Sequence, residues 1–184
     1  MSRLVIPQQF FNRPTLRVAR ELLGKFLVRR IGRRTVARMI TEVEAYVGPE
    51  DRASHAWKGE RTRNRVMFSK PGIWYVYFTY GMHWMLNVVT ERAGYPAAIL
   101  VRGVAAPEGG EPRHRREGVS GPARVTKFFK IDRRFNSKPA SRRTGLWIED
   151  RGLRIPPRRI RRAKRIGVDY AGAWRDKLWR FFLV

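Results

Sequence analysis

The sequence predicts an α+β fold, in which mainly antiparallel strands form a sheet and a few helices lie at its periphery. The chain of 184 residues has the length of one domain and is long enough to bury a substantial core. Most of its predicted elements are strands, and they do not alternate with helices as in a βαβ unit. No glycine-rich phosphate-binding fingerprint is present, which disfavours Rossmann and P-loop enzymes. We therefore expect a single domain over residues 1–184.

An amphipathic helix opens the domain, and two strands follow it. Apolar residues recur on one helical face through 16–23, with Thr15 available as the N-cap and Gly24 suited to a left-handed stop. Residues 26–30 and 36–46 have the composition of strands, and a glycine-containing turn joins them.

The second of these strands carries two carboxylates on one face. Its side chains alternate, with Met39, Thr41, Val43 and Ala45 on one face and Ile40, Glu42, Glu44 and Tyr46 on the other. The acidic face is either a solvated surface whose acids pair with cations, or a pocket wall with a carboxylate beside an aromatic platform. In a pocket, the carboxylate could activate water for attack on an electrophilic carbon, as in glycoside hydrolysis. Periodicity does not choose between Glu42 and Glu44.

A hairpin with an unusual tip is predicted next. Residues 73–79 and 83–90 form strand-like runs, and Tyr80-Gly81-Met82 connects them. Because hairpin tips normally carry Asn, Asp and Gly, the segment is either a longer buried strand with a glycine bulge or an exposed apolar wedge. Such wedges enter the minor groove and fill the space of an extruded base. Tyr77 could face the same cavity as Tyr46, and two such rings would sandwich a planar base.

The remaining segments have simpler interpretations. We expect an irregular polar stretch at 47–71, a strand at 97–103, a mobile surface loop at 106–120, a helix from Gly121-Pro122 through Lys130 and a short strand at 146–149. From residue 155 a basic run leads to an end rich in Trp and Phe, which we expect to return to the core.

The charge favours a polyanionic partner but identifies no function. Forty Lys and Arg against fifteen Asp and Glu give a formal net charge of +25, and only eight of the forty basic residues are lysines. Nucleic acid is the first partner to consider and an anionic membrane surface the second. Arginine richness can equally reflect genome composition or heat adaptation. Because 43% of the residues are hydrophobic, the chain is not a charged disordered tail.

Several classes of protein are excluded by the sequence. The chain has no cysteine, which excludes disulfide scaffolds, thiolate metal sites and cysteine nucleophiles. It has no apolar run of membrane-spanning length and no signal-peptide core, so we expect an intracellular protein. His55, His83 and His114 show no metal-ligand spacing, and no Gly-x-Ser-x-Gly motif occurs. We therefore expect a reaction that uses no metal.

Ordered sequence blocks extend from Phe10 nearly to the C-terminus. They are 42–51 (EVEAYVGPED) with Ser54-His55, 63–68 (RNRVMF) with 70–72 (KPG), 75–77 (YVY), 80–82 (YGM) with Asn87, 100–102 (LVR), Gly121-Pro122, 165–168 (RIGV) and 179–181 (WRF). Together they resemble the alkyladenine (3-methyladenine) DNA glycosylase family. Ordered blocks of this extent are far more specific than a single motif.

The resemblance implies excision of alkylated or deaminated purines, such as 3-methyladenine, 7-methylguanine, hypoxanthine and ethenoadenine, from double-stranded DNA. The damaged nucleotide is flipped out and its N-glycosidic bond is hydrolysed, which leaves an abasic site. By motif position Glu44, rather than Glu42, corresponds to the general base, and Arg102 to the arginine that helps to hold the attacking water and the nearby phosphate. We expect a monomer without cofactor or membrane partner, in the cytoplasm or nucleoid, or in the nucleus of a eukaryote.

The same resemblance implies a fold and a binding pocket. The fold is one compact domain around a curved antiparallel sheet with a protruding hairpin, similar to the C-terminal domain of formyltransferases. Tyr46, His55 and Tyr77 correspond to the rings that stack on the base, and the amide around His55 corresponds to a reader of the base edge. Asn87 corresponds to an asparagine that excludes normal guanine by clashing with its 2-amino group.

The hairpin tip also resembles the family, whereas two other places depart from its pattern. Tyr80 corresponds to the residue inserted into the minor groove, with Met82 beside it. The sequence departs from the pattern at 103–106 and at Arg124, where a lysine is usual and the contact geometry therefore changes. Two rival functions are a non-catalytic basic nucleic-acid-binding or architectural protein, and an RNA-binding β-protein that prefers single strands.

Overall fold

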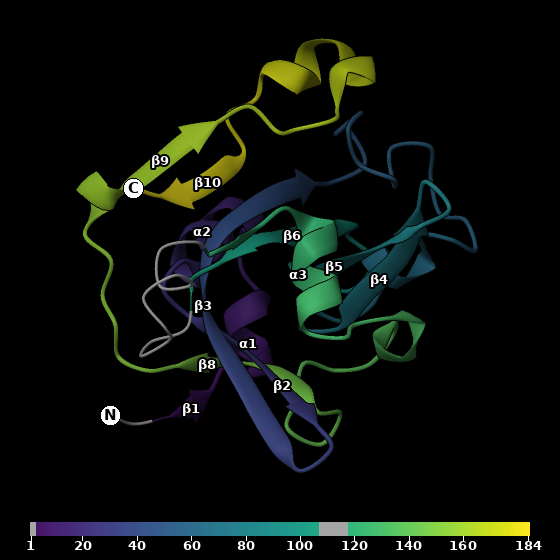
Figure 1. Cartoon of the computed structure of the whole chain (residues 1–184). Coiled ribbons are helices and arrows are strands. Elements are labelled where there is room, and N and C mark those ends of the chain that lie inside the picture. The colour runs from purple at the N-terminus through teal and green to yellow at the C-terminus, as the bar shows by residue number, and fades with distance from the viewer. Residues whose placement is uncertain (1–2, 107–117) are drawn as a thin grey trace.

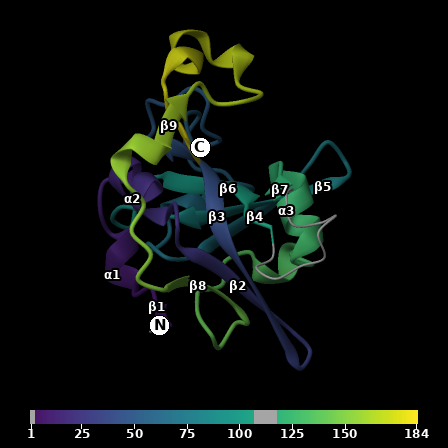
Figure 2. The same ribbon diagram turned by 60° about the vertical axis from the view of Figure 1, so that its left-hand side comes forward.

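Strand β3 (Arg34–Val47) organises the sheet. The structure, a computed structural model, describes residues 3–106 and 118–184. The first half of β3 pairs with β2 (Phe26–Ile31), and its second half lies between β6 (Ala97–Val104) and β10 (Arg180–Leu183), antiparallel to each. Figure 1 shows β3 running from its turn with β2 toward the C-terminal strands, and Figure 2 shows the same arrangement from another side.

The other strands are short and pair antiparallel with their neighbours. They are β1 (Leu4–Val5), β4 (Trp74–Thr79), β5 (His83–Val89), β7 (Val119–Ser120), β8 (Leu146–Asp150) and β9 (Ile160–Ala163). The order through the sheet is β1-β8-β2-β3-β6-β5-β4, while β10 joins β3, β9 joins β10 and β7 joins β6. The helices are α1 (Gln8–Phe11), α2 (Thr15–Leu22), α3 (Pro122–Phe128) and the 3₁₀ helices η1 (Arg65–Phe68), η2 (Arg133–Phe135), η3 (Pro157–Arg159) and η4 (Asp169–Asp176). This arrangement confirms the predicted α+β class.

The two faces of the sheet differ in what they bury. One face forms the main hydrophobic core together with α2 and α3, and β3, β5 and β6 contribute to it Val43, Ala45, Leu86, Val88, Ile99 and Val101. The positions between them point to the opposite face, as a period of two requires. There, Tyr46, Asn87, Ala98 and Leu100 line a cavity. Tyr75, Tyr77 and Thr79 line it too, which confirms their predicted common face.

An irregularity between β3 and β6 corrects the prediction for Ile40. Ile40 pairs with Val104, but Glu42 pairs with Gly103 and the next residue, Val43, pairs with Val101. The ladder thus shifts once on each strand, and a shift of one residue moves side chains to the other face. Ile40 is therefore fully buried in the main core with Val43, and not on the face of Glu42 as strict alternation predicts.

The start of α2 differs from the predicted cap. The helix begins at Thr15 itself, after Pro14, so Thr15 is not its N-cap. The backbone N–H and the hydroxyl of Thr15 both donate to the Glu91 carboxylate, at 2.8 and 2.9 Å. A carboxylate brought from another part of the chain thus satisfies the helix start. At the other end the predicted stop is confirmed, since Gly24 has a φ of +85°.

The middle and the end of the chain follow most of the predicted elements. Strands β4 and β5 form the expected hairpin, in which Thr79 pairs with His83 across three connecting residues. The C-terminal segment returns to the core as predicted, because β10 pairs with β3 and Phe181 is buried. In Figures 1 and 2 this segment lies beyond the end of β3 that is remote from the β2–β3 turn.

The helix that begins at Pro122 and the loop before it differ from the prediction. Helix α3 ends at Phe128 rather than at Lys130, because Lys130 has a left-handed φ of +51° that no α-helix contains. Most of the loop expected at 106–120 lies outside the described residues, but its last two residues form β7 beside β6. Among residues 3–106 and 118–184, no helix is long and apolar enough to cross a membrane.

Candidate active site

A cavity of about 500 Å³ opens on the face of the sheet opposite the main core. Strands β3, β4, β5 and β6 form its floor, and the segments 53–67 and 166–170 form its sides. Of the eight site residues predicted from the sequence, six line it: Tyr46, His55, Tyr77, Tyr80, Asn87 and Arg102. The fold thus brings together residues that are up to 56 positions apart in the chain.

Glu44 lies directly behind the cavity wall and is completely inaccessible to solvent. Its Oε2 accepts a hydrogen bond of 2.9 Å from the Tyr46 hydroxyl, and its Oε1 accepts one of 2.8 Å from the backbone N–H of Ile166. Arg102 Nε lies 3.4 Å from Oε1. All three partners of this carboxylate line the cavity, so a single layer of residues separates Glu44 from the cavity.

The two carboxylates left open by periodicity have different surroundings. Glu42 Oε1 is paired with two guanidinium groups, Arg102 Nε at 3.2 Å and Arg180 Nη1 at 3.1 Å. For Glu44, burial raises the pKa, while Arg102, the Ile166 N–H and the Tyr46 hydroxyl oppose the rise. A carboxylate with a raised pKa is a better proton acceptor near neutral pH. The environment therefore favours Glu44 over Glu42 as a base.

Arg102 owes its position to the irregular pairing of β3 and β6. It lies on β6 between Val101 and Gly103, which pair with successive residues of β3, so Arg102 itself has no partner there. Such irregularities often re-aim a side chain beside an active site. Here the guanidinium reaches both Glu42 and Glu44 and faces the cavity.

Aromatic rings form one side of the cavity. The His55 and Tyr77 ring centroids are 4.6 Å apart at an interplanar angle of 69°, and Tyr75 and Tyr77 are 5.2 Å apart at 35°. The Tyr75 hydroxyl lies 2.9 Å from Nδ1 of His55. Desolvation by the surrounding residues, helped by the charge of Arg63, lowers the pKa of His55 to about 4. The imidazole is therefore neutral at physiological pH although the cavity leaves it accessible.

Asn87 lies on the cavity floor and is almost fully buried. Its Nδ2 donates a hydrogen bond of 3.1 Å to the backbone carbonyl of Tyr75, the residue that faces it across the β4–β5 pair. This bond fixes the orientation of the amide, so a ligand on the cavity floor would contact a side chain with little conformational freedom.

The two residues predicted for the hairpin tip separate in space. Tyr80 is 80% exposed at the rim of the cavity, and this exposure rules out the alternative that the segment is a buried strand. Met82 is also exposed, but it borders a different hollow of about 440 Å³ together with Trp84 and Lys127. The structure therefore brings Tyr80 to the cavity and leaves Met82 outside it.

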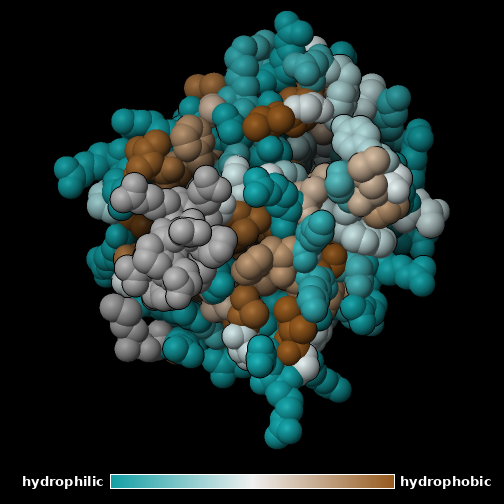
Figure 3. Space-filling model, viewed as in Figure 1, coloured by the Kyte–Doolittle hydropathy of each residue, from teal (hydrophilic) through white to brown (hydrophobic). Residues whose placement is uncertain are grey.

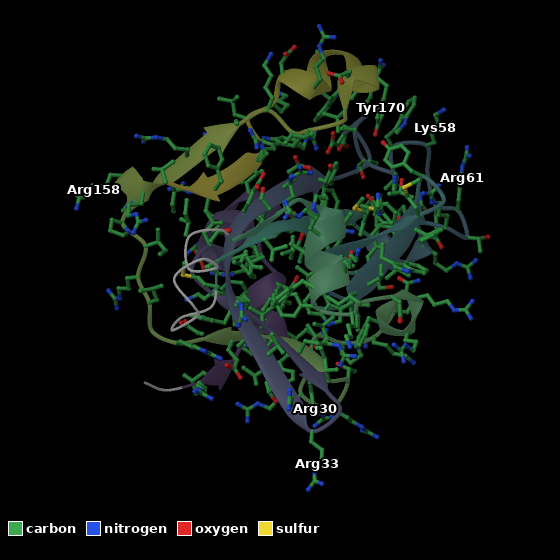
Figure 4. All side chains as sticks on the ribbon, viewed as in Figure 1. Arg30, Arg33, Lys58, Arg61, Arg158 and Tyr170 are labelled. Atoms are coloured by element: carbon green, nitrogen blue, oxygen red, sulfur yellow. The ribbon has the colours of Figure 1, made fainter. Side chains whose placement is uncertain are left out.

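Some residues that line the site had no role predicted from the sequence. Arg63 lies with its guanidinium carbon 5.7 Å from the Tyr77 ring centroid and donates to the Phe78 carbonyl. Tyr170, labelled in Figure 4, lines the cavity from η4 and donates a hydrogen bond to the Ala53 carbonyl. Arg63 belongs to the block 63–68 and Tyr170 follows the block 165–168, but no local pattern there indicates which side chain faces inward.

A larger hollow of about 1020 Å³ lies between α2 and the segment 153–162. Its two acidic residues are already paired, Glu21 with Arg13 and Arg17, and Asp150 with Lys25. Among the described residues that line it, there is no cluster of aromatic rings beside a buried acid, in contrast to the cavity above. Size alone therefore does not identify the site.

The fold and the cavity together define a class: a single α+β domain with a cavity lined by aromatic rings, a buried acid behind its wall and an exposed tyrosine at its entrance. Comparison with known proteins identifies the family. Residues 9–184 match the methylpurine-DNA glycosylase (MPG) family.

Individual relatives agree with this match over almost the whole chain. A Methanocella arvoryzae protein named "Putative 3-methyladenine DNA glycosylase" is 46% identical over 97% of this chain and 92% of its own length. The Mus musculus DNA-3-methyladenine glycosylase is 38% identical over 95% of this chain and 58% of its own length. The chain belongs to the methylpurine-DNA glycosylase family, and it is an enzyme of the DNA-3-methyladenine glycosylase class that acts on DNA in its repair.

Proposed function

We propose that residues 1–184 act as one monomeric, monofunctional glycosylase domain that releases alkylated or deaminated purines from double-stranded DNA. The damaged nucleotide leaves the base stack and enters the aromatic cavity, where water cleaves the bond between the base and C1′ of the sugar. The lesion class comprises 3-methyladenine, 7-methylguanine, hypoxanthine and ethenoadenine. The products are the free base and an abasic site.

Glu44 supplies the base for this hydrolysis. The water oxygen forms a bond to C1′, the C1′–N bond breaks with its electron pair going to the departing purine, and the water proton passes to Glu44. Because Glu44 is inaccessible in this structure, the reaction requires Arg102 to move aside so that the water reaches the carboxylate. An oxygen of an ionised carboxylate has more than one acceptor position, so Glu44 can then accept from the water while it keeps the bonds from Tyr46 and Ile166. The negative charge also stabilises the oxocarbenium-like sugar in the transition state.

Arg102 places a positive charge beside the Glu44 carboxylate. Its guanidinium lies beside Glu44 at the cavity wall, where it can hold the water and the phosphate next to the sugar. Because Arg102 also pairs with Glu42, the guanidinium is held from both sides before the water enters. A cation close to Glu44 favours the ionised carboxylate that the mechanism needs.

The electrostatics of the rings suit an alkylated purine. A purine alkylated at N3 or N7 carries positive charge, and the faces of aromatic rings attract cations. A neutral His55 adds a ring face without a repelling charge, while Tyr46 and Tyr77 provide further faces. The cationic purine leaves without protonation, whereas hypoxanthine is neutral and takes a proton from solvent as it leaves. We therefore expect faster release of the cationic lesions.

Asn87 restricts which base can enter the cavity, and Tyr80 keeps the flipped nucleotide from returning to the stack. The amide of Asn87 is fixed by its bond to the Tyr75 carbonyl, so a guanine 2-amino group directed at it would clash. Tyr80 projects from the hairpin at the cavity rim, where it can occupy the space that the flipped base leaves in the duplex. Filling this space offsets part of the cost of unstacking, which amounts to a few kcal/mol.

One observation carries this proposal: a solvent-free carboxylate with a raised pKa lies one side chain behind a cavity lined with aromatic rings, in a member of this family. The test is single-turnover release of each of the four lesions from duplexes, followed as alkali-labile abasic sites. We expect Glu44→Gln to abolish release and to leave duplex binding intact. Release at the unaltered rate by this variant would contradict the assignment of the base.

A matched control uses another buried acid. Glu149 on β8 is 3% exposed and accepts hydrogen bonds from Trp147 and Arg151, away from the cavity. Glu149→Gln makes the same chemical change without touching the site, so we expect normal rate constants in its folded fraction. Binding of damaged duplex without release of any lesion by the unaltered protein would instead favour a non-catalytic binder.

A further inference from the structure

A buried ion pair links the two sides of the cavity. The side chains of Arg165 and Asp51 are both completely inaccessible. Arg165 Nη2 lies 2.9 Å from Asp51 Oδ1, and Arg165 Nη1 lies 2.5 Å from Oδ2, which makes a two-pronged contact. Asp51 also accepts the backbone N–H groups of Val47 and Ala53. The pair therefore joins the segment after β3 to the segment before η4.

The Arg165 guanidinium is surrounded by aromatic rings as well. Its central carbon lies 4.9 Å from the centroid of the Tyr46 ring and 5.0 Å from that of Trp179. Its remaining hydrogen bonds go to the carbonyls of Ala45 and Trp174, and its Nε has no hydrogen-bond partner among the described residues. Burying two charges and leaving one donor unpaired costs free energy, so such a pair is weak evidence for a gain in stability.

Both hydrogen bonds that hold Glu44 depend on this one side chain. The donor to Oε1 is the backbone N–H of Ile166, the residue that directly follows Arg165. The donor to Oε2 is the hydroxyl of Tyr46, whose ring lies against the guanidinium. We propose that Arg165, anchored by Asp51, is a positioning residue of the excision reaction, which fixes the two donors that aim the Glu44 carboxylate. This inference rests on the proposed role of Glu44 as the base.

The same geometry predicts an effect on ionisation. Arg165 and Arg102 lower the pKa of Glu44 against the effect of burial, as do its two hydrogen-bond donors. If the Arg165 charge is removed, the pKa of Glu44 rises, and the acid limb of the rate profile moves to higher pH because only the ionised carboxylate accepts the proton. The charged and titratable groups around Glu44 are Tyr46 and Glu42 on β3, Arg102 on β6, Tyr77 on β4, Arg180 on β10, and Arg165.

Two substitutions of Arg165 distinguish the effect of its geometry from the effect of its charge. Arg165→Lys keeps the cation but loses the planar contact with Asp51, and Arg165→Met loses both. We expect Arg165→Lys to slow single-turnover excision by about 10²-fold, the size expected for a misplaced catalytic group, with a nearly unchanged acid limb. We expect Arg165→Met to be slower still and to move the acid limb to higher pH. Binding of undamaged duplex should change less than twofold.

Controls address folding. Arg151→Lys alters another largely buried arginine, whose Nε and Nη2 both contact Glu149 on β8, and should leave the rate unchanged. Should Arg165→Met fail to fold, Asp51→Asn with Arg165→Met removes both buried charges together and serves in its place. With enzyme in excess, the single-turnover rate constant does not depend on the folded fraction.

The possible results separate the positioning role of Arg165 from the proposed function. Unchanged rate constants and an unmoved acid limb in the Arg165 variants, with Glu44→Gln inactive, would overturn the positioning role and leave the proposed function intact. Equal loss of thermal stability and rate in Arg151→Lys and Arg165→Lys would also overturn it, because any buried pair would then act alike. Normal excision by Glu44→Gln would overturn the proposed function instead.

Discussion

His55 presents a neutral ring to a cavity that we expect to bind a cation, and its surroundings are the cause. The neighbouring Tyr75 hydroxyl contacts Nδ1, and the Arg63 charge adds to desolvation in disfavouring the imidazolium form. A histidine with its ordinary pKa would be partly charged just below neutral pH and would repel an alkylated purine. Lesion binding should therefore not weaken as a result of His55 titration between about pH 5 and 8.

A titration followed by NMR checks this at the level of the residue. His55 is one of only three histidines in the chain, so its resonances can be assigned by substitution. We expect its pKa near 4, against 6.5 for a free histidine. Because the unfolded chain binds the proton more readily, His55 lowers the free energy of unfolding as the pH falls from about 6.5 to 4. His55→Gln should flatten this part of the stability curve, and an unchanged slope would contradict the assignment.

At single positions, sequence reasoning succeeds where a period of two is undisturbed. The common face of Tyr75, Tyr77 and Thr79 follows directly from the alternation of a regular strand. The prediction for Ile40 is wrong because the shifted ladder between β3 and β6 moves its side chain to the other face of the sheet, and no local residue pattern marks that shift. Arg165 carried no predicted role because its partner Asp51 lies 114 positions away. The roles of the site residues remain predictions until the variants are measured.

The β4–β5 hairpin is the element that separates the cavity from the neighbouring hollow. Tyr80 has a φ of +52° and Gly81 one of +66°, so the tip turns sharply and directs the two flanking side chains apart. Tyr80 reaches the rim of the cavity, while Met82 borders the hollow beside α3. The hairpin itself was predictable from its strands, but the separation of its two apolar side chains depends on this backbone conformation.

This geometry predicts unequal effects of two substitutions on the same turn. Tyr80→Ala removes a largely exposed ring, so we expect a change in stability within about 0.5 kcal/mol. Its affinity for damaged duplex should fall clearly, as seen by fluorescence anisotropy, because the vacated stack loses its plug. Met82→Ala is the matched control and should weaken binding less. Equal losses in both variants would mean that the whole tip, rather than Tyr80, enters the duplex.

The start of α2 gives a prediction about stability alone. Glu91 accepts both donors of Thr15 and places negative charge at the N-terminus of the helix. Glu91→Ala should lower the free energy of unfolding by about 1 kcal/mol, the usual cost of losing a helix cap, without affecting excision. Glu60→Ala removes an exposed acid that pairs with the exposed Arg65 and should have almost no effect. Denaturant unfolding of both variants measures the difference.

For the molecule as a whole, the charge is spread over more surface than one DNA footprint covers. Figure 4 shows Arg33 at one end of the molecule, Arg158 on another side, and Lys58 and Arg61 on the side of Tyr170. Figure 3 shows hydrophilic residues over most of the same face, interrupted by separate hydrophobic patches. Only the cations near the cavity can contact DNA whose damaged nucleotide is inside it. We expect the rest of the net charge of +25 to serve stability or to reflect composition.

Salt dependence tests this distribution. Affinity for undamaged duplex should fall steeply as salt rises, because each neutralised phosphate releases condensed counterions. Replacing Lys58 and Arg61 by Gln should reduce the slope of log affinity against log salt by about 1 for each phosphate that the variant no longer neutralises. Replacing Arg33 and Arg158 by Gln is the matched control and should leave the slope unchanged. A similar reduction in both pairs would mean that DNA is attracted by the net charge alone.

The pairing of β10 with β3 determines when, during synthesis of the chain, the candidate active site can be completed. Arg180 lies opposite Glu44, so the strand that carries the proposed base is flanked on one side by a residue that the ribosome adds 136 positions later (180 − 44). The ribosome synthesises the chain from the N-terminus onward, at about 5–20 residues per second, and a domain folds as a unit. Until residues 180–183 leave the exit tunnel, the edge of β3 at Glu44 lacks its neighbour, and Arg180 cannot pair with Glu42. A chain synthesised only as far as β6 therefore carries Glu44 and Arg102 without the strand that flanks Glu44, and we expect it to release no damaged base.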